Sequence, residues 1–228
     1  MKIIRDSLMD GAKRAKGLTV IIDVFRACTT AAYVMNNGAK KIIATGDLKD
    51  SFDLKKHNPE YILMGERKGL KVNGFDYGNS PFEIKEVNFS GKTVVLNTTA
   101  GTQGIVLAKN ADDIILGNFV CANAIVNYIK KQNPNIVYIV AMGNSGNKTI
   151  DEDELLAKYL ENSLKGKSTN FEKIKEHLKN YKSAKKFFDP NKPDLPEGDF
   201  HCALDLDKFN FIMKVSDRNN LEIIKENG

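Results

Sequence analysis

Short apolar runs alternate with amphipathic stretches along the chain, and polar residues directly follow most of these runs. The β-branched run 20–22 is typical of a strand buried on both faces, and Asp23 stands where this strand should end. Arg26, Thr29 and Thr30 come next, and the apolar residues after them have helical spacing. The predicted order along the chain is therefore a strand, an acidic residue, a basic residue, two residues with hydroxyl groups, and a helix.

The same alternation predicts the other elements of the chain. The helix after Asp23 should end near residue 36, and residues 41–45 then form a strand that completes a β-α-β unit. Residues 1–17 are expected to be an edge strand or an arm. Further strands are expected at 61–64, 92–96, 114–118, 136–141 and 211–215. Further helices are expected at 47–57, 122–131, 151–164 and 170–188, and one more helix follows the loop 97–104 and ends near residue 110.

Strands separated by helices predict an α/β fold. We expect three layers, α/β/α, around a mostly parallel or mixed sheet. A chain of 228 residues suits one domain over residues 1–228, and two subdomains at roughly 1–118 and 119–228 are the alternative.

Composition narrows the class of protein. Hydrophobic residues make up 42% and charged residues 28%, and no apolar run approaches the ~20 residues that span a bilayer. Without a recognisable signal peptide, we expect a cytoplasmic protein with no membrane partner. The net charge of +5 is spread over separate lysine pairs that do not alternate with aromatic residues, so we expect no nucleic-acid partner but attraction of small anions. Cys28, Cys121 and Cys202 lie too far apart to indicate a disulfide framework or a zinc site.

The loops after the strands are the expected site, because ligands in open α/β sheets bind beyond the carboxyl ends of the strands. We expect Asp23 to hold a metal and Arg26 a phosphate; the alternative is a capping aspartate beside a solvated arginine. Hydroxyl, amide and guanidinium groups of these loops are candidate anion ligands, although turns and structural ion pairs use the same residues. The candidates for substrate binding are Arg26, Thr29, Thr30, Arg67, Asn79, Ser80, Thr98, Thr99 and Thr102.

Further acids offer metal ligands or a proton donor. Glu152 and Asp153 begin an expected helix, where they suit the helix dipole or, as hard oxygen ligands, Mg²⁺. Asp205 follows an apolar pair and is a candidate general acid, with His201 as a weaker one. The loops match neither the G-x-x-x-x-G-K-[ST] nor the G-x-G-x-x-G pattern, so we expect no nucleotide site.

Five motifs in series resemble the 2-phosphosulfolactate phosphatase family. They are Ile22-Asp-Val-Phe-Arg-Ala-Cys-Thr-Thr30, Gly65-Glu-Arg67, Gly74-Phe-Asp-Tyr-Gly-Asn-Ser-Pro81, Asn97-Thr-Thr-Ala-Gly-Thr102 and Ala203-Leu-Asp205. Two departures stand out. Cys28 occupies a position where the family usually has Thr or Ser, and Glu152-Asp153 match the family's Glu-Asp pair only if the preceding loop is one residue longer.

This resemblance implies a Mg²⁺-dependent phosphatase that releases phosphate from 2-phospho-3-sulfolactate, a step of coenzyme M synthesis. Asp23 with Glu152 or Asp153 would hold the magnesium ion, and Arg26, Arg67 and the threonines would bind a small anionic phosphorylated substrate. Either Asp23 or a metal-bound water would attack phosphorus. Three alternatives stay open, namely a phosphatase of another phosphorylated hydroxy acid, a non-catalytic anion-binding protein, and an enzyme that uses Cys28 or Cys121. A homodimer is also left open.

Overall fold

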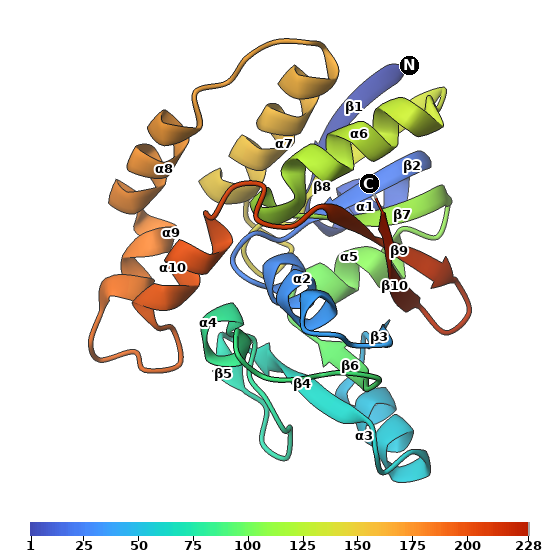
Figure 1. Ribbon diagram of the computed structural model, residues 1–228, viewed down its shortest axis with the longest axis vertical. Helices are drawn as coiled ribbons and strands as arrows, with labels where there is room; N and C mark the ends of the chain where they lie inside the picture. Colours follow the sequence, from blue (N-terminus) through green and yellow to red (C-terminus); the bar gives the residue numbers. More distant parts are fainter. Residues whose placement is uncertain (228) are drawn as a thin grey trace.

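The strands of the computed structural model, which describes residues 1–227, form one sheet in the order β1-β8-β2-β7-β9-β10-β3-β6-β4-β5 (Figure 1). The strands are β1 (Lys2–Ser7), β2 (Gly17–Ile22), β3 (Lys41–Ala44), β4 (Ile62–Arg67), β5 (Leu70–Lys71), β6 (Thr93–Asn97), β7 (Ala111–Gly117), β8 (Ile136–Ala141), β9 (Phe211–Asp217) and β10 (Glu222–Asn227).

Helices fill the connections between the strands. They are α1 (Leu8–Arg14), α2 (Ala27–Asn36), α3 (Leu48–His57), α4 (Pro81–Ile84), α5 (Gly101–Leu107), α6 (Ala122–Gln132), α7 (Asp151–Leu164), α8 (Phe171–Asn180), α9 (Lys182–Lys185) and α10 (Glu197–Ala203), with short 3₁₀ turns η1 (Phe119–Cys121) and η2 (Lys186–Phe188).

The sheet consists of two parallel groups of strands joined by an antiparallel hairpin. Strands β1, β8, β2 and β7 are parallel to one another, as are β3, β6 and β4. The β9–β10 hairpin lies between these groups, because β9 pairs with β7 and β10 pairs with β3, both antiparallel. The predicted mixed sheet is confirmed. Strands from residues 1–118 and from residues 119–228 are interleaved in it.

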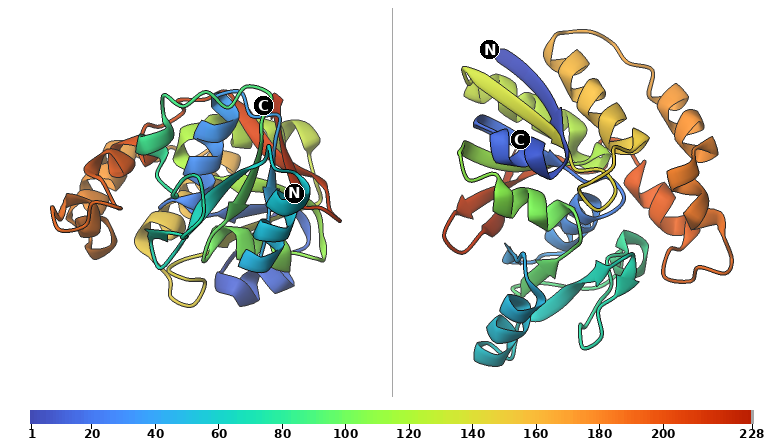
Figure 2. Two further views of the ribbon diagram at one scale, coloured as in Figure 1. Left: turned by 90° about the horizontal axis from the view of Figure 1, so that it is seen from below. Right: turned by 180° about the vertical axis from the view of Figure 1, so that it is seen from behind.

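Helices cover both faces of the sheet. Figure 1 shows α2 and α6 in front of the sheet, and the view from behind in Figure 2 shows α1 and α5 on the opposite face. The expected three-layer α/β/α architecture is therefore confirmed. Helices α8, α9 and α10 lie together at one end of the molecule, where α10 packs against α4 and α8 against α7 (Figure 1).

Burial on both faces explains the composition of the central strands. Val20, Ile21 and Ile22 of β2 are all fully buried, so side chains that point to either face meet an apolar layer. Helix α6 instead has one apolar face, with Ile125 and Ile129 buried while Lys130 is exposed. The core thus lies between the sheet and the two helical layers.

The structure differs from the expected elements in several places, and the short elements β5, α4 and α10 were not predicted. Residues 1–17 form the edge strand β1, as expected, but also helix α1. Strand β10 was not expected, because its sequence Glu-Ile-Ile-Lys-Glu-Asn has a charged residue on either side of a short apolar pair. The expected helix 170–188 is interrupted at Tyr181, whose backbone is extended. Helix α5 ends before the predicted residue 110, and β7 begins correspondingly earlier.

In residues 1–227, none of the helices has the length and apolar character needed to cross a bilayer.

The hairpin joining the two strand groups gives a first testable prediction. Ile223 of β10 is fully buried between Ile42 of β3 and Val215 of β9, so Ile223→Ala should lower the free energy of unfolding by about 3 kcal/mol. Its neighbour Ile224 points to the other face and is only partly buried, so Ile224→Ala is the matched control with a loss below about 1.5 kcal/mol. Urea unfolding of both variants measures this difference. Equal losses would show that β10 is not packed as described.

Candidate active site

A pocket of about 560 Å³ lies where loops from both strand groups meet. The loops that follow β2, β6 and β8 and the end of β4 form one part of its wall, and residues 181–195 form another part. Among the residues that line it are Asp23, Phe25, Arg26, Glu66, Lys68, Asn79, Thr99, Lys148, Glu152, Lys182, Ser183 and Lys186.

Asp23 follows β2 directly and lines the pocket, as expected from the sequence. Its Oδ1 accepts a hydrogen bond from the backbone N–H of Ala27 (3.2 Å), so it also closes the turn into α2. Burial, together with the nearby Glu66 carboxylate, raises the pKa of Asp23 to about 6. Gly101 makes room for it, because a Cβ at that position would lie 2.8 Å from Asp23 Oδ2. Asp23 is therefore a tightly enclosed carboxyl group at the pocket wall.

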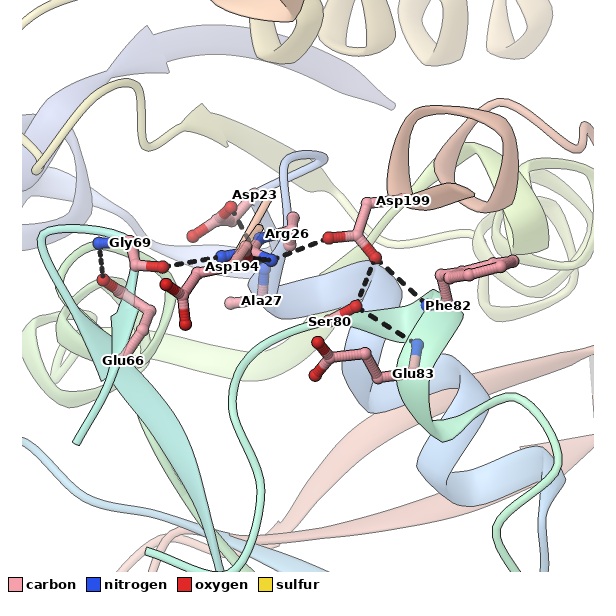
Figure 3. A network of polar contacts seen from close by, with 10 residues as sticks. All are labelled: Asp23, Arg26, Ala27, Glu66, Gly69, Ser80, Phe82, Glu83, Asp194 and Asp199. Atoms are coloured by element: carbon pink, nitrogen blue, oxygen red, sulfur yellow. Dashed lines mark hydrogen bonds and ion pairs between the residues drawn. The ribbon is translucent and has the colours of Figure 1, made fainter. Parts of the chain in front are cut away.

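Arg26 lies in a buried polar network (Figure 3). Its Nη1 donates to Asp199 Oδ2 (2.7 Å) and to the carbonyl of Asp194 (3.0 Å), and its Nη2 donates to the carbonyl of Gly69 (3.1 Å). Among the described residues these bonds do not use all the N–H donors of a guanidinium, and Arg26 also lines the pocket. Arg26 is thus fixed by protein groups while keeping donors for a ligand.

Ser80 and Asp199 extend this network to α4. Ser80 Oγ donates to Asp199 Oδ1 (2.6 Å), and Asp199 Oδ1 also accepts the backbone N–H of Phe82 (3.1 Å), as Figure 3 shows. Ser80 Oγ in turn accepts the N–H of Glu83, which caps α4. Ser80 is therefore beside the pocket rather than in its lining. Asp199 was not among the residues singled out in the sequence, because only the fold brings α10 to Arg26.

Glu66 joins the end of β4 to the loop after β6. Its carboxylate accepts the N–H (2.7 Å) and the hydroxyl (3.0 Å) of Thr99 and the N–H of Gly69 (2.7 Å). The preceding Gly65 permits this close approach of two strands, since its φ is +153° and a Cβ there would lie 1.9 Å from the carbonyl oxygen of Asn97. Thr99 and Glu66 thus form one wall of the pocket together.

The two acids at the start of α7 have different surroundings. Asp153 accepts the N–H of Val24 and the N–H of Gly143, both at 2.8 Å, and so ties the loop after β2 to the loop after β8 without lining the pocket. Glu152 lines the pocket, and its Oε2 accepts the hydroxyl of Ser183 (2.6 Å). Burial raises the pKa of both carboxyl groups. Glu152 is the acid of this pair that faces the cavity.

Two buried oxygens in the pocket wall suit a hard cation. Within residues 1–227, Glu152 Oε1 and Asn79 Oδ1 are buried and have no hydrogen-bond partner. Carboxylate and amide oxygens are ligands that Mg²⁺ accepts, and Mg²⁺ commonly uses one or two protein carboxylates while keeping several waters. Asp23, Glu152 and Asn79 thus bring oxygen atoms of a suitable kind to one pocket. The described part of the chain contains no group of three or more His, Cys, Asp or Glu side chains that could by themselves hold a metal ion.

The lysine-rich segment contributes to the pocket in a way that the sequence did not indicate. Lys182, Ser183 and Lys186, from α9 and η2, all line it. Phe187 fixes this segment by packing edge-on against Phe25, with 5.0 Å between ring centroids. A pattern of many lysines on an amphipathic helix gives no sign of which one turns inward, so no sequence signal could have selected Lys186.

The remaining predicted residues lie outside the pocket lining. Thr29 and Thr30 are buried inside α2, and Thr98 and Thr102 hydrogen-bond to each other below the pocket wall. Arg67 donates to the carbonyl of its neighbour Glu66. Asp205 lies in another pocket, beside His201 and Cys202. The structure does not bring these side chains into contact with Asp23 or Arg26.

The cysteines are also placed away from the pocket. Cys28 and Cys121 are buried, and burial raises the pKa of Cys28 well above its usual range and that of Cys121 to about 12. Such thiols carry little thiolate at neutral pH. The arrangement therefore gives no support to a cysteine nucleophile.

Known proteins resemble this chain over most of its length. A family model described as 2-phosphosulpholactate phosphatase matches residues 4–218. A protein of Bacillus subtilis (strain 168), named probable 2-phosphosulfolactate phosphatase, is 33% identical over 213 residues, which are 91% of this chain and 91% of that protein. A protein of the same name from Caldicellulosiruptor saccharolyticus is 40% identical over 144 residues, or 61% of this chain and 59% of its own length. The resemblance seen in the five motifs is confirmed, and the chain belongs to the 2-phosphosulpholactate phosphatase family.

Proposed function

We propose that this protein hydrolyses 2-phospho-3-sulfolactate to sulfolactate and inorganic phosphate. We further propose that the reaction depends on Mg²⁺ and is a cytoplasmic step of coenzyme M synthesis. The family match supports the reaction, and the composition of the pocket supports its chemistry. The observation that carries the proposal is a single cavity whose lining includes the oxygen-bearing side chains of Asp23, Asn79 and Glu152 together with the guanidinium group of Arg26.

Phosphoryl transfer needs positioning and charge neutralisation more than covalent help from the protein. Arg26 would bind the phosphoryl oxygens with the N–H donors that its protein partners leave free. Its position is fixed before the substrate arrives, because Asp199 and two backbone carbonyls hold the guanidinium. Such preorganisation avoids the cost of reorienting the group during the reaction.

Asp23, Glu152 and Asn79 would hold the magnesium ion. When bound, Mg²⁺ supplies a Lewis acid for the phosphoryl group and lowers the pKa of bound water. It would also compensate the buried carboxylates, whose charged forms are costly in the empty pocket.

Phosphate release from a panel of esters tests the proposal. Racemic 2-phospho-3-sulfolactate, 2-phosphoglycerate, phospholactate and p-nitrophenyl phosphate would each be supplied with Mg²⁺ and with EDTA. We expect metal-dependent release from the sulfolactate ester and little from the others. Release from several esters would support a phosphatase activity but contradict the proposed substrate. No release from any ester would refute the function and favour an anion-binding protein.

A substitution of Asp23 should separate activity from stability. Asp23→Asn should abolish turnover but raise the melting temperature of the metal-free protein at pH 7.5. The raised pKa means that the folded state favours the protonated form, so the free energy of unfolding falls as the pH rises from about 4 to about 6. The charge therefore costs the folded state up to about 3 kcal/mol at neutral pH, and asparagine removes this cost.

Thermal unfolding at pH 5 and pH 7.5 measures the effect of Asp23→Asn, which should be larger at pH 7.5. The exposed Asp112→Asn serves as the control and should change neither activity nor stability appreciably. A destabilised Asp23→Asn protein at pH 7.5 would contradict the assignment of Asp23 as a strained buried acid.

Asp199 should act through Arg26. Asp199→Asn should lower the free energy of unfolding by about 3 kcal/mol, because it leaves a buried guanidinium without its counter-charge. It should also lower kcat/KM by about tenfold or more, since Arg26 loses its fixed orientation. Glu197→Gln on the same helix alters only an exposed pair with His201 and serves as the control. Wild-type kinetics and unfolding for Asp199→Asn would disprove this role.

A further inference from the structure

Lys186 differs from the other lysines of the pocket. Lys68, Lys148 and Lys182 also line the cavity, but their side chains are exposed. Among the lining lysines of residues 1–227, only Lys186 is largely shielded from solvent. The charges of exposed lysines are weakened by water and salt, whereas a shielded ammonium group interacts strongly with an anion. Lys186 is therefore the lysine whose charge matters most to a ligand.

Within residues 1–227, the ammonium group of Lys186 has no counter-ion in direct contact. In the part of the chain that the structure describes, no carboxylate lies within the 4.0 Å that defines an ion pair with it. Its Nζ lies 5.1 Å from the centroid of the Phe187 ring, a contact that replaces little of the lost hydration. Burial accordingly lowers the pKa of Lys186. A shielded charge without a partner is costly, which points to a partner that arrives with the ligand.

Glu152 does not fill that place. The charges of Glu152, Asp23 and Asp153 stabilise the ammonium form of Lys186 from a distance. Glu152 Oε2 instead accepts the hydroxyl of Ser183, and its Oε1 has no hydrogen-bond partner within residues 1–227. The pocket thus offers an acid that suits a cation and, separately, an ammonium group that suits an anion. A ligand that brings both Mg²⁺ and a second negative group satisfies both charges.

We infer that Lys186 binds the second anionic group of the substrate, a carboxylate or sulfonate, while Arg26 binds the phosphoryl group. This inference rests on the proposed function, because it assigns a specificity-determining residue to that site. The packing of Phe187 against Phe25 keeps Lys186 in place, so the distance between the two anion-binding groups is set by the fold. Esters that carry phosphate as their sole anionic group would not use Lys186.

Steady-state kinetics of Lys186→Met tests this role. Methionine keeps the length and apolar stem but removes the charge. KM for 2-phospho-3-sulfolactate should rise by about tenfold or more, because the substrate loses a charge-assisted hydrogen bond. The kcat/KM for p-nitrophenyl phosphate, which we expect to be low in the wild type, should change by less than about twofold. Lys185→Met is the matched control, since Lys185 is the exposed neighbour and does not line the pocket.

Isothermal titration calorimetry tests the role of Lys186 in binding without relying on turnover. The probes are sulfolactate, which has no phosphate, and inorganic phosphate, which has no second acidic group. Lys186→Met should weaken sulfolactate binding by about tenfold and leave phosphate binding unchanged. Equal binding of sulfolactate to both proteins, or equal losses for every ester and both probes, would overturn the inference. Failure of wild-type turnover with intact, Lys186-dependent sulfolactate binding would refute the proposed reaction and retain this anion site.

Discussion

The walls of the pocket are held together by the ion pair between Arg26 and Asp199, whose side chains are 4% and 0% exposed. The carbonyls of Gly69 and Asp194 accept further hydrogen bonds from the same guanidinium. One side chain thus connects the start of α2 to α10, to the turn after β4 and to the proline-containing connection before α10. A buried pair adds little net stability, but the loss of either partner leaves a charge that the interior cannot solvate. The arrangement of the pocket therefore depends on both residues.

The pocket also concentrates carboxyl groups that would repel one another if they were all charged. Asp23, Glu152 and Asp153 are buried, burial raises the pKa of each, and the charges of Asp23 and Glu152 raise the pKa of Asp153 further. Asp153 is compensated by two backbone N–H groups, whereas Asp23 and Glu152 retain capacity toward the cavity. Asp153 therefore holds two loops together, whereas Asp23 and Glu152 are the acids that could bind a cation. The charged forms of Asp23 and Glu152 lower the stability of the folded state, so their place in the pocket is explained by binding and not by stability.

Much of the fold and part of the site follow from the sequence. Apolar runs bounded by polar residues located the parallel strands, and the rule that ligands bind beyond strand ends placed Asp23 and Arg26 in the pocket. Thr29 and Thr30 were predicted in the same stretch, but they lie beyond the first residues of α2, where side chains turn into the core. Lys186 and Asp199 escaped notice because long-range packing alone determines which residue of an amphipathic helix faces a site. Strand β10 escaped because charged residues flank its short apolar pair.

The β9–β10 hairpin has a consequence for the order in which the chain folds. The two parallel strand groups share no direct strand pairing, so β3 and β7 are joined only through residues 211–227. During synthesis, a chain that has not yet extended past β8 contains both groups, each with an open edge. Open edges of this kind are prone to pair with other chains. Closure of the sheet must therefore wait until residues 211–227 have been synthesised, and long-range pairing of this type slows folding.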